Sequence, residues 1–237
     1  MSSKEAGEQG KEAAGIRAAR DVESGMVLGL GTGSTVAYFL EALGKRIRAG
    51  EITEIVGVPT SRRTEEAALT LGIPLTTLEE AGTLDLTVDG ADEVDPSLDL
   101  IKGMGGALLR EKMVAQATRR MVVIVDEGKV VEKLGTRSPL PVEVTPFGWK
   151  SHPPFFRSLG AEARLRCAED GEPYFTDNGN LLLECTFSEG IPDPGELDRL
   201  LASRAGIVES GLFLSLAREA LVGGEDGVRV LTRGDSE

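Results

Sequence analysis

Residues 84–112 have the sequence LDLTVDGADEVDPSLDLIKGMGGALLREK, and this stretch is the most informative about the fold of the chain. Apolar and polar residues alternate over 84–88, which predicts a β-strand. The strand ends in DGADE, residues 89–93, where three acidic side chains repel one another, and this cost to folding indicates that they are used. A second short strand over 98–101, a lysine and a glycine-rich turn then lead into a helix that carries Glu111.

The predicted helix places Glu111 among apolar side chains. Three and four residues away along the helix are Ala107, Leu108, Val114 and Ala115. A carboxylate on an apolar helix face is desolvated, which raises its pKa and makes it a better proton acceptor near neutral pH. The helix alone also allows another interpretation, in which this glutamate lies at the rim of the helix face and pairs with a distant arginine.

Composition limits the class of protein. The chain has 237 residues, of which 41% are hydrophobic and 27% charged, so it can form one large globular domain with a small insert. No apolar run approaches about 18 residues, so we expect no membrane-spanning helix. The polar start over 2–10 lacks the apolar segment of a signal peptide and is expected to be a frayed tail. Two cysteines are too few for a disulfide framework, which favours a reducing, cytoplasmic setting.

The charge of the chain argues for a small anionic ligand and against nucleic acid. The net charge is −13, whereas nucleic-acid-binding proteins need basic patches. Residues 102–133 nevertheless hold seven basic and four acidic side chains, and 7 − 4 gives a local charge of +3. A local positive field favours an anionic substrate, although a solvated helix face can have the same composition.

A second motif indicates phosphate binding. A short strand over 26–28 leads into GLGTGST, residues 29–35, and then into a helix over 36–48. Free backbone N–H groups at such a helix start favour an anion. The dinucleotide-binding pattern G-x-G-x-x-G fails at Ser34, and the nucleotide triphosphate pattern lacks its lysine. A phosphomonoester held by Thr32, Ser34 and Thr35 fits better, and a plain glycine-rich turn is the alternative.

Strands and helices alternate along the first half of the chain. Further elements are expected as a helix over 11–21, a strand over 54–58, a helix over 62–71, and strands over 74–76 and 121–125. Such alternation predicts a Rossmann-like, doubly wound α/β sheet. The polar motifs follow the ends of predicted strands, at 32–35, 60–61, 89–93 and 126–129. Ligands of these sheets bind along that edge, so the motifs are expected to meet there.

The composition changes after about residue 134, which predicts an inserted small α+β domain. Its expected elements are strands over 137–146, 161–167, 174–176 and 180–187 and helices over 149–159 and 194–205. We expect this domain to span 134–206 and the main domain to comprise 1–133 and 207–237. Strands over 207–208, 221–222 and 228–231 are expected to return to the first sheet. The only histidine, His152, is interpreted as structural, and with no cysteine cluster most zinc sites are excluded.

Four motifs in order along the chain resemble the ribose-5-phosphate isomerase A family. They are GTGST at 31–35, DGADE at 89–93, KGMGGA with REK between 102 and 112, and TDNGN at 176–180. The resemblance implies an aldose–ketose isomerase that interconverts D-ribose 5-phosphate and D-ribulose 5-phosphate in the non-oxidative branch of the pentose phosphate pathway. It also implies no metal or organic cofactor, a ferredoxin-like small domain used for oligomerisation, and a homo-oligomer, either a dimer or a tetramer.

The resemblance also assigns functions to individual residues. The glutamate of REK, here Glu111, corresponds to the family's proton acceptor. The substrate-binding positions carry over to Lys11, Thr32, Gly33, Ser34, Thr35, Asp89, Gly90, Ala91, Asp92, Lys102, Gly103, Met104, Gly105 and Lys129. Met104 departs from the family, which usually has glycine there, and its bulk is expected to narrow the cavity or change the turn.

The chemistry of isomerisation suggests what each charged group does. Moving a proton between C2 and C1 through an enediolate needs a base over the carbons and a cation where negative charge grows on oxygen. We expect Glu111 to be the base and Lys102 to stabilise the oxyanion, while Asp89 and Asp92 hold sugar hydroxyls and assist ring opening. A sugar-phosphate sensor domain is the alternative from another class, but it requires a basic DNA-binding helix that the acidic N-terminus lacks.

Overall fold

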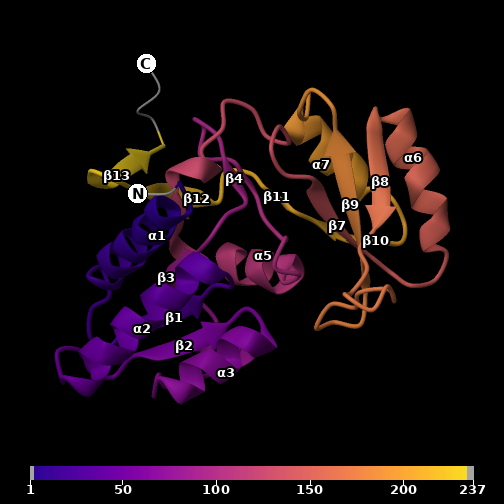
Figure 1. The fold of residues 1–237 in the computed structure, drawn as a ribbon. Helices are drawn as coiled ribbons and strands as arrows, with labels where there is room; N and C mark the ends of the chain where they lie inside the picture. Colours follow the sequence, from indigo (N-terminus) through magenta and orange to yellow (C-terminus); the bar gives the residue numbers. More distant parts are fainter. Residues whose placement is uncertain (1–2, 234–237) are drawn as a thin grey trace.

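The computed structural model describes residues 3–233, with side chains described from Gly7 onward. The chain forms a six-stranded sheet at one end, with β1, β2 and β3 in purple and β12 and β13 in yellow in Figure 1, and a four-stranded sheet around the orange β9 at the other. A third sheet of three very short strands packs against the six-stranded sheet, and residues of both sheets share one hydrophobic cluster.

The six-stranded sheet is parallel except at one edge. Its order is β13-β12-β6-β3-β1-β2, and only β13 runs antiparallel to its neighbour. Its strands are β1 (Val27–Leu30), β2 (Val56–Pro59), β3 (Leu84–Asp89), β6 (Thr118–Asp126), β12 (Ala217–Gly224) and β13 (Gly227–Thr232). Strands β2 and β3 lie on opposite sides of β1, so the strand order reverses there. In a sheet of this kind such a reversal opens a crevice at the carboxyl ends of β1 and β3.

Helices cover both faces of this sheet, as expected for a doubly wound fold. Helices α1 (Ser3–Ala19) and α2 (Ser34–Arg48) pack on one face, where Phe39 and Leu43 meet the strand leucines in a single core. Helix α5 (Leu108–Gln116) packs on the other face, where Val114 contacts Leu84. The α/β class predicted from the alternating motifs is therefore confirmed.

Two short helices complete the first half of the chain, α3 (Arg62–Thr70) and α4 (Leu78–Ala81). The predicted frayed tail over 2–10 is wrong over 3–10, because α1 begins at Ser3, and residue 2 lies outside the described residues. The predicted strand over 74–76 is only a single bridge between Leu75 and Gly57.

The four-stranded sheet has the order β10-β7-β9-β8 and is antiparallel throughout. Its strands are β7 (Leu140–Val144), β8 (Ala161–Leu165), β9 (Leu181–Phe187) and β10 (Ile207–Ser210), with α6 (His152–Ser158) and α7 (Pro194–Ala202) packed against them. The expectation that residues 207–208 return to the first sheet is wrong, because β10 pairs with β7. The predicted strand over 174–176 is a single bridge at Phe175.

The three-stranded sheet joins the two larger ones. It contains β4 (Glu93–Val94), β5 (Leu100–Ile101) and β11 (Leu212–Phe213), in the order β11-β5-β4. Two 3-10 turns, η1 (Glu127–Lys129) and η2 (Trp149–Ser151), complete the described secondary structure. Because β5 ends at Ile101, this small sheet sets the position of Lys102, which follows directly.

Candidate active site

A cavity of about 140 Å³ lies at the carboxyl ends of β1 and β3, where the strand order reverses. Its lining combines the glycine turn after β1, the acidic turn after β3, the turn before α5, and single lysines from α1 and η1. The lining residues are Lys11, Thr32, Gly33, Ser34, Thr35, Gly90, Ala91, Asp92, Lys102, Gly103, Gly105, Glu111 and Lys129. Every one of them was assigned to the site from the sequence, and the two assigned residues outside this lining are Asp89 and Met104.

A buried lysine between two carboxylates forms the floor of the cavity. The Nζ atom of Lys102 lies 2.9 Å from Oδ2 of Asp89 and 3.3 Å from Oε1 of Glu111. It also donates a hydrogen bond of 2.6 Å to the carbonyl of Gly90. All three side chains are almost fully buried, at 2%, 0% and 3% exposure respectively. Oε2 of Glu111 accepts no hydrogen bond from the described chain, so one buried carboxylate oxygen remains available to a ligand.

Burial and neighbouring charges shift the pKa values of this cluster. Desolvation, and next the negative charge of Asp89, raise the pKa of Glu111 to about 8, against the opposing effect of Lys102. Desolvation lowers the pKa of Lys102, but the charges of Asp89 and Glu111 outweigh it and the net shift is upward. The lysine therefore stays protonated, whereas the glutamate can gain and lose a proton near neutral pH. The predicted burial of Glu111 and rise of its pKa are confirmed.

Asp89 lies beneath the cavity and supports it. Its Oδ1 atom accepts N–H bonds from Thr32 at 3.0 Å and from Gly90 at 2.7 Å, and its Oδ2 atom faces Lys102. One carboxylate thus fixes the turn after β1, the turn after β3 and the lysine. Asp92, by contrast, lines the cavity, and its Oδ2 atom accepts the N–H of Met104 at 2.9 Å.

The turn after β1 presents an anion-binding helix start. Helix α2 begins at Ser34, and its N-cap Gly33 has φ 144°, a conformation that favours glycine. The N–H groups of Ser34 and Thr35 make no hydrogen bond within the described residues, and both residues line the cavity. Lys11, whose amine pairs with Glu8 at 2.7 Å, and Lys129 bring two cations to the same place. The arrangement suits a phosphate group.

Four buried hydroxyl groups fix this turn from behind. Oγ1 of Thr32 lies 2.8 Å from Oγ1 of Thr60, 2.8 Å from Oγ of Ser61 and 3.0 Å from Oγ1 of Thr64. Thr64 in turn donates to the carbonyl of Gly31 at 2.8 Å. The sequence placed residues 60–61 at this edge of the sheet but did not identify Thr64. Because its hydroxyl is held in this way, Thr32 offers the cavity its backbone and methyl group.

Three other residues singled out from the sequence lie outside the cavity. Met104 is 41% exposed and does not line it, so the expected narrowing by its side chain is absent. Glu93, the third acid of DGADE, is fully buried and accepts N–H bonds from residues 135, 137 and 138. His152 is buried on α6, where its Nδ1 atom accepts a bond from Arg204, which fits a structural part.

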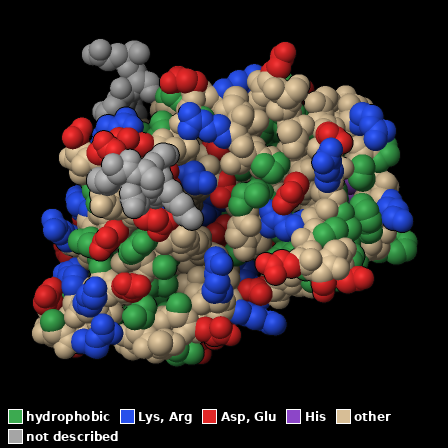
Figure 2. Space-filling view, viewed as in Figure 1, with side chains coloured by type: hydrophobic (Ala, Val, Ile, Leu, Met, Phe, Trp, Pro, Cys, Tyr) green, Lys and Arg blue, Asp and Glu red, His purple; other side chains and the backbone are tan. Residues whose placement is uncertain are grey.

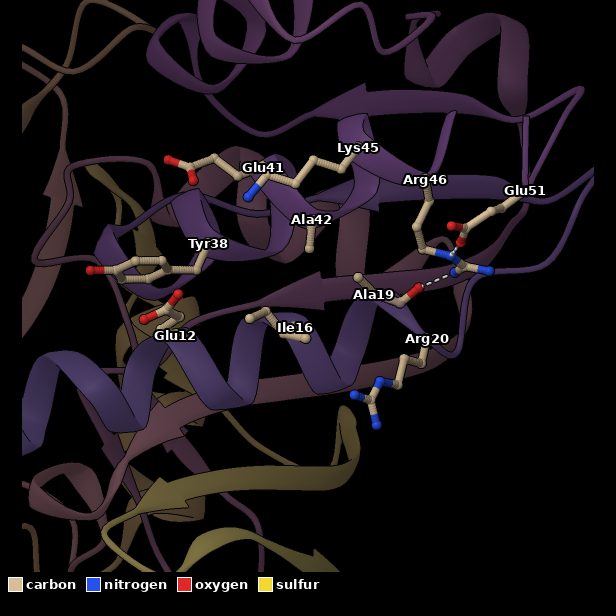
Figure 3. A pocket seen from close by; sticks show the side chains of 10 residues that line it. All are labelled: Glu12, Ile16, Ala19, Arg20, Tyr38, Glu41, Ala42, Lys45, Arg46 and Glu51. Atoms are coloured by element: carbon tan, nitrogen blue, oxygen red, sulfur yellow. Dashed lines mark hydrogen bonds and ion pairs between the residues drawn. The ribbon is translucent and has the colours of Figure 1, made fainter. Parts of the chain in front are cut away.

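A second groove lies between α1 and α2 and has a different character (Figure 3). Ile16, Ala19 and Ala42 form its floor, and both acidic and basic side chains stand around its rim. It contains no buried titratable group and none of the residues assigned to the site. On the face drawn in Figure 2, acidic and basic side chains are interspersed in the same way.

Among the described residues, no group of three or more His, Cys, Asp or Glu side chains is arranged to hold a metal ion. No helix in residues 3–233 is both long enough and apolar enough to cross a bilayer.

Comparison with known proteins gives consistent matches over nearly the whole chain. The family model described as ribose 5-phosphate isomerase A (phosphoriboisomerase A) matches residues 56–227. The chain is 51% identical over 214 residues to ribose-5-phosphate isomerase A of Chloroflexus aurantiacus, covering 90% of this chain and 89% of that protein. It is 46% identical to probable ribose-5-phosphate isomerase 2 of Arabidopsis thaliana, covering 93% and 85%.

Solved structures agree with these relatives. A D-ribose-5-phosphate isomerase in complex with phospho-erythronic acid has a TM-score of 0.93 at 40% identity, with 96% of this chain and 99% of that one covered. The ribose 5-phosphate isomerase of Plasmodium falciparum has a TM-score of 0.92 at 37% identity, with the same coverage.

Proposed function

The chain belongs to the ribose-5-phosphate isomerase A family and interconverts ribose 5-phosphate and ribulose 5-phosphate, and on that premise we propose how its residues perform the reaction. Glu111 is the base that moves the proton between C2 and C1. The observation that carries this proposal is its buried carboxylate, which lines the cavity with one oxygen free and has a pKa near neutrality. A general base works best when its pKa lies near the working pH.

The proton transfer proceeds through an enediolate. The ionised Glu111 carboxylate removes the hydrogen on C2 of the open-chain aldose, and the C2–H electron pair forms the C1=C2 double bond while O1 takes up negative charge. The Lys102 ammonium group faces that charge and stabilises it. A proton then passes between the two oxygens, Glu111 returns its proton to C1, and the carbonyl is left on C2. No electrons enter or leave the substrate.

The remaining residues hold and orient the sugar phosphate. The phosphate binds at the start of α2, to Gly33, Ser34 and Thr35, with Lys11 and Lys129 completing its charge neutralisation. Asp92 and the backbone of Gly90, Ala91, Gly103 and Gly105 contact the sugar hydroxyls, with Asp92 assisting ring opening. Binding energy from the phosphate, remote from the reacting carbons, then orients C1 and C2 over Glu111.

We assign Asp89 and Met104 differently from the other site residues. Asp89 acts through Lys102, because it is fully buried beneath the lysine and outside the cavity lining. Met104 contributes its backbone N–H to Asp92, while its side chain points outward.

We propose that the molecule is a homo-oligomer, a dimer or a tetramer, that associates through the small domain around the four-stranded sheet. Large apolar side chains exposed on that domain, Phe147, Phe175 and Leu200, support this assignment. The expected boundaries of 134–206 are extended to Ser210, because β10 pairs within that sheet. We further infer a cytoplasmic location and no nucleic-acid partner, the latter supported by the net charge of −13.

A direct assay tests the reaction. Purified protein is mixed with ribose 5-phosphate in excess chelator, with no added cofactor, and formation of the ketose is followed. We expect ribulose 5-phosphate to accumulate to equilibrium at a rate that is independent of the chelator. A rate that falls with chelator and recovers with added metal contradicts a cofactor-free mechanism.

A further inference from the structure

A fully buried glutamate in the four-stranded sheet is linked to the catalytic helix by a chain of hydrogen bonds that the reaction itself does not require. Glu143 lies on β7 with no exposed surface. Its Oε1 atom accepts three bonds, from Oγ1 of Thr176 at 2.9 Å, Nδ2 of Asn178 at 3.1 Å and Nδ2 of Asn180 at 2.9 Å. The carboxylate thus gathers three side chains of one turn, residues 176–180.

The turn is also closed by its own backbone. The N–H of Thr176 donates to the carbonyl of Asn180, and the N–H of Gly179 donates to the carbonyl of Thr176, both at 2.9 Å. Gly179 has φ +78°, which glycine adopts without strain. Side-chain and backbone bonds together thus fix the conformation of this turn.

From this turn, bonds run to the helix that carries the proposed base. Oδ1 of Asn178 accepts a bond of 2.9 Å from Nε of Arg110, and the carbonyl of Asp177 accepts one of 3.3 Å from Nη2. Arg110 lies in the first turn of α5, immediately before Glu111. In Figure 1 the orange turn lies beside α5, at the junction of the two halves of the molecule.

The polarity of these groups fixes the direction of the chain of bonds. A carboxylate only accepts and a guanidinium only donates. The amide of Asn178 therefore has to turn its NH₂ group to Glu143 and its oxygen to Arg110. Replacing the carboxylate by an amide removes its negative charge and turns one of its two oxygens into an NH₂ donor, so the three donors lose their charged acceptor.

The same segment holds the other side of the site. Arg166 donates to the carbonyls of Gly103 and Met104 at 3.3 and 3.1 Å, directly after Lys102. A Cβ atom on Gly106 would lie 2.2 Å from the hydroxyl of Tyr174, so this ring is packed onto the turn before α5. Both the lysine and the glutamate of the proposed mechanism are thus supported by residues 166–180.

We propose that Glu143, acting through Asn178 and Arg110, holds the first turn of α5 so that Glu111 keeps its place against Lys102 and the substrate. Glu143, Asn178 and Arg110 are positioning residues in this account, which rests on the proposed function of Glu111. A displacement of the base by about 1 Å is enough to cost on the order of 100-fold in rate.

The test compares Asn178→Ala and Glu143→Gln with wild type. Asn178 is exposed, so its variant is expected to fold even where the buried Glu143→Gln does not. We expect kcat to fall by roughly 10- to 100-fold, with KM within about threefold, because binding groups stay in place. The rise of kcat/KM with pH, which follows ionisation of Glu111, should also move to lower pH, because a loosened Glu111 is better hydrated and its pKa falls. Glu162→Gln, on an exposed strand position paired only with Arg164, is the matched control and should behave as wild type.

A double-mutant cycle shows whether the effect passes through Arg110. If it does, Asn178→Ala combined with Arg110→Ala lowers kcat no further than the worse single variant, whereas independent effects multiply. Unchanged kcat and an unchanged pH profile in folded Asn178→Ala, or multiplying effects in the cycle, overturn the proposal. Glu111→Gln is assayed alongside: if it retains normal kcat, the base assignment fails, and the positioning proposal fails with it.

Discussion

At the scale of single residues, the site depends on one lysine held between two buried carboxylates. Asp89 lies 2.9 Å from Lys102 on one side, and Glu111 lies 3.3 Å away on the other. Burial raises the pKa of Asp89, against the opposing effects of Lys102 and of the two backbone N–H bonds that it accepts. Asp89 lies outside the cavity lining, whereas Glu111 is part of it. Glu111 is left as the carboxylate that can exchange its proton with a substrate.

The raised pKa of Glu111 predicts a pH dependence of the forward reaction. Only the ionised carboxylate removes a proton, so kcat/KM should rise with pH and level off above about 8. The substrate's phosphate also titrates, near pH 6, so the rise due to Glu111 is best measured from about pH 7 upward. Steady-state kinetics from pH 7 to 9.5 provide the measurement. A flat profile over this range contradicts the raised pKa.

Replacing Lys102 should affect catalysis more than substrate capture. Lys102→Ala is expected to lower kcat by on the order of 100-fold, as for a lost oxyanion donor. The charge of Lys102 also lowers the pKa of Glu111, so in the variant the rise of kcat/KM should occur at higher pH. Lys150→Ala, in the small domain beside Trp149, is the control. If KM alone changed, Lys102 would be a binding residue.

At the residue scale, the sequence predicted the environment of a side chain best where the neighbours that surround it are close in the chain. Apolar residues at helical spacing correctly placed Glu111 in a buried environment. The same reasoning could not find Glu143 or Thr64, because the contacts that bring them to the site, with Thr176 and with Thr32, span 33 and 32 residues of the chain. The backbone carbonyl of Met104 likewise accepts a bond from Arg166, which is 62 residues distant.

At the scale of elements, the close approach of β1 to β3 makes glycine necessary where β1 ends. A Cβ atom on Gly31 would lie 2.1 Å from Oδ1 and 2.6 Å from the Cα atom of Asp89. Side-chain adjustment cannot relieve the backbone contact, so the two turns that line the cavity would have to separate.

Gly31→Ala is therefore expected to lower both stability and activity. We expect the free energy of unfolding to fall by about 1–3 kcal/mol, as for other overpacked sites, and kcat/KM to fall with it. Gly7→Ala on α1 meets no atom within 4 Å and should be neutral or stabilising by about 1 kcal/mol. Urea titration of both variants tests the contrast, and equal stability of the two contradicts the close approach.

The boundaries of elements were predictable only where the periodic signal was long. Helices α2 and α3 and strand β3 lie within a few residues of their predicted ranges. Strands β4 and β11 were missed because two-residue strands carry no measurable alternation. The start of α1 was missed because residues 3–10 are polar, whereas packing of the following turns against α2 stabilises the whole helix.

At the scale of the whole molecule, Glu93 ties the two halves together. Its carboxylate accepts N–H bonds from Gly135 and Arg137 at 2.6 Å and from Ser138 at 2.5 Å, in the segment that leads from the first half into β7. Glu93, the third acidic residue of the DGADE motif, therefore has a structural function, and the proposed reaction does not require it.

Glu93→Gln should destabilise the protein while leaving the chemistry of the folded site largely intact. An amide offers one oxygen and turns an NH₂ group toward a buried N–H, so we expect a loss of about 1–3 kcal/mol. Glu132→Gln, an exposed position nearby, should stay within about 0.5 kcal/mol of wild type. Denaturant unfolding measures both, and equal stability of the two variants contradicts the assignment.

The overall topology was predictable in class but not in its strand assignments. The alternation of strands and helices predicted the doubly wound sheet, and the polar motifs after the strands predicted the edge at which its ligand binds. The pairing of β10 with β7 was not predictable, because the two residues expected as a strand, 207–208, are too few to show a preference for either large sheet.

Exchange of the transferred hydrogen with solvent tests the central claim most directly. In D₂O, wild-type protein should incorporate deuterium from solvent into the sugar phosphate during isomerisation, followed by NMR, because Glu111 can exchange its proton with solvent before returning it. Glu111→Gln should bind the sugar phosphate with similar affinity but exchange about 10²–10⁴-fold more slowly, the usual contribution of a general base. Exchange at a near wild-type rate in Glu111→Gln would contradict the account.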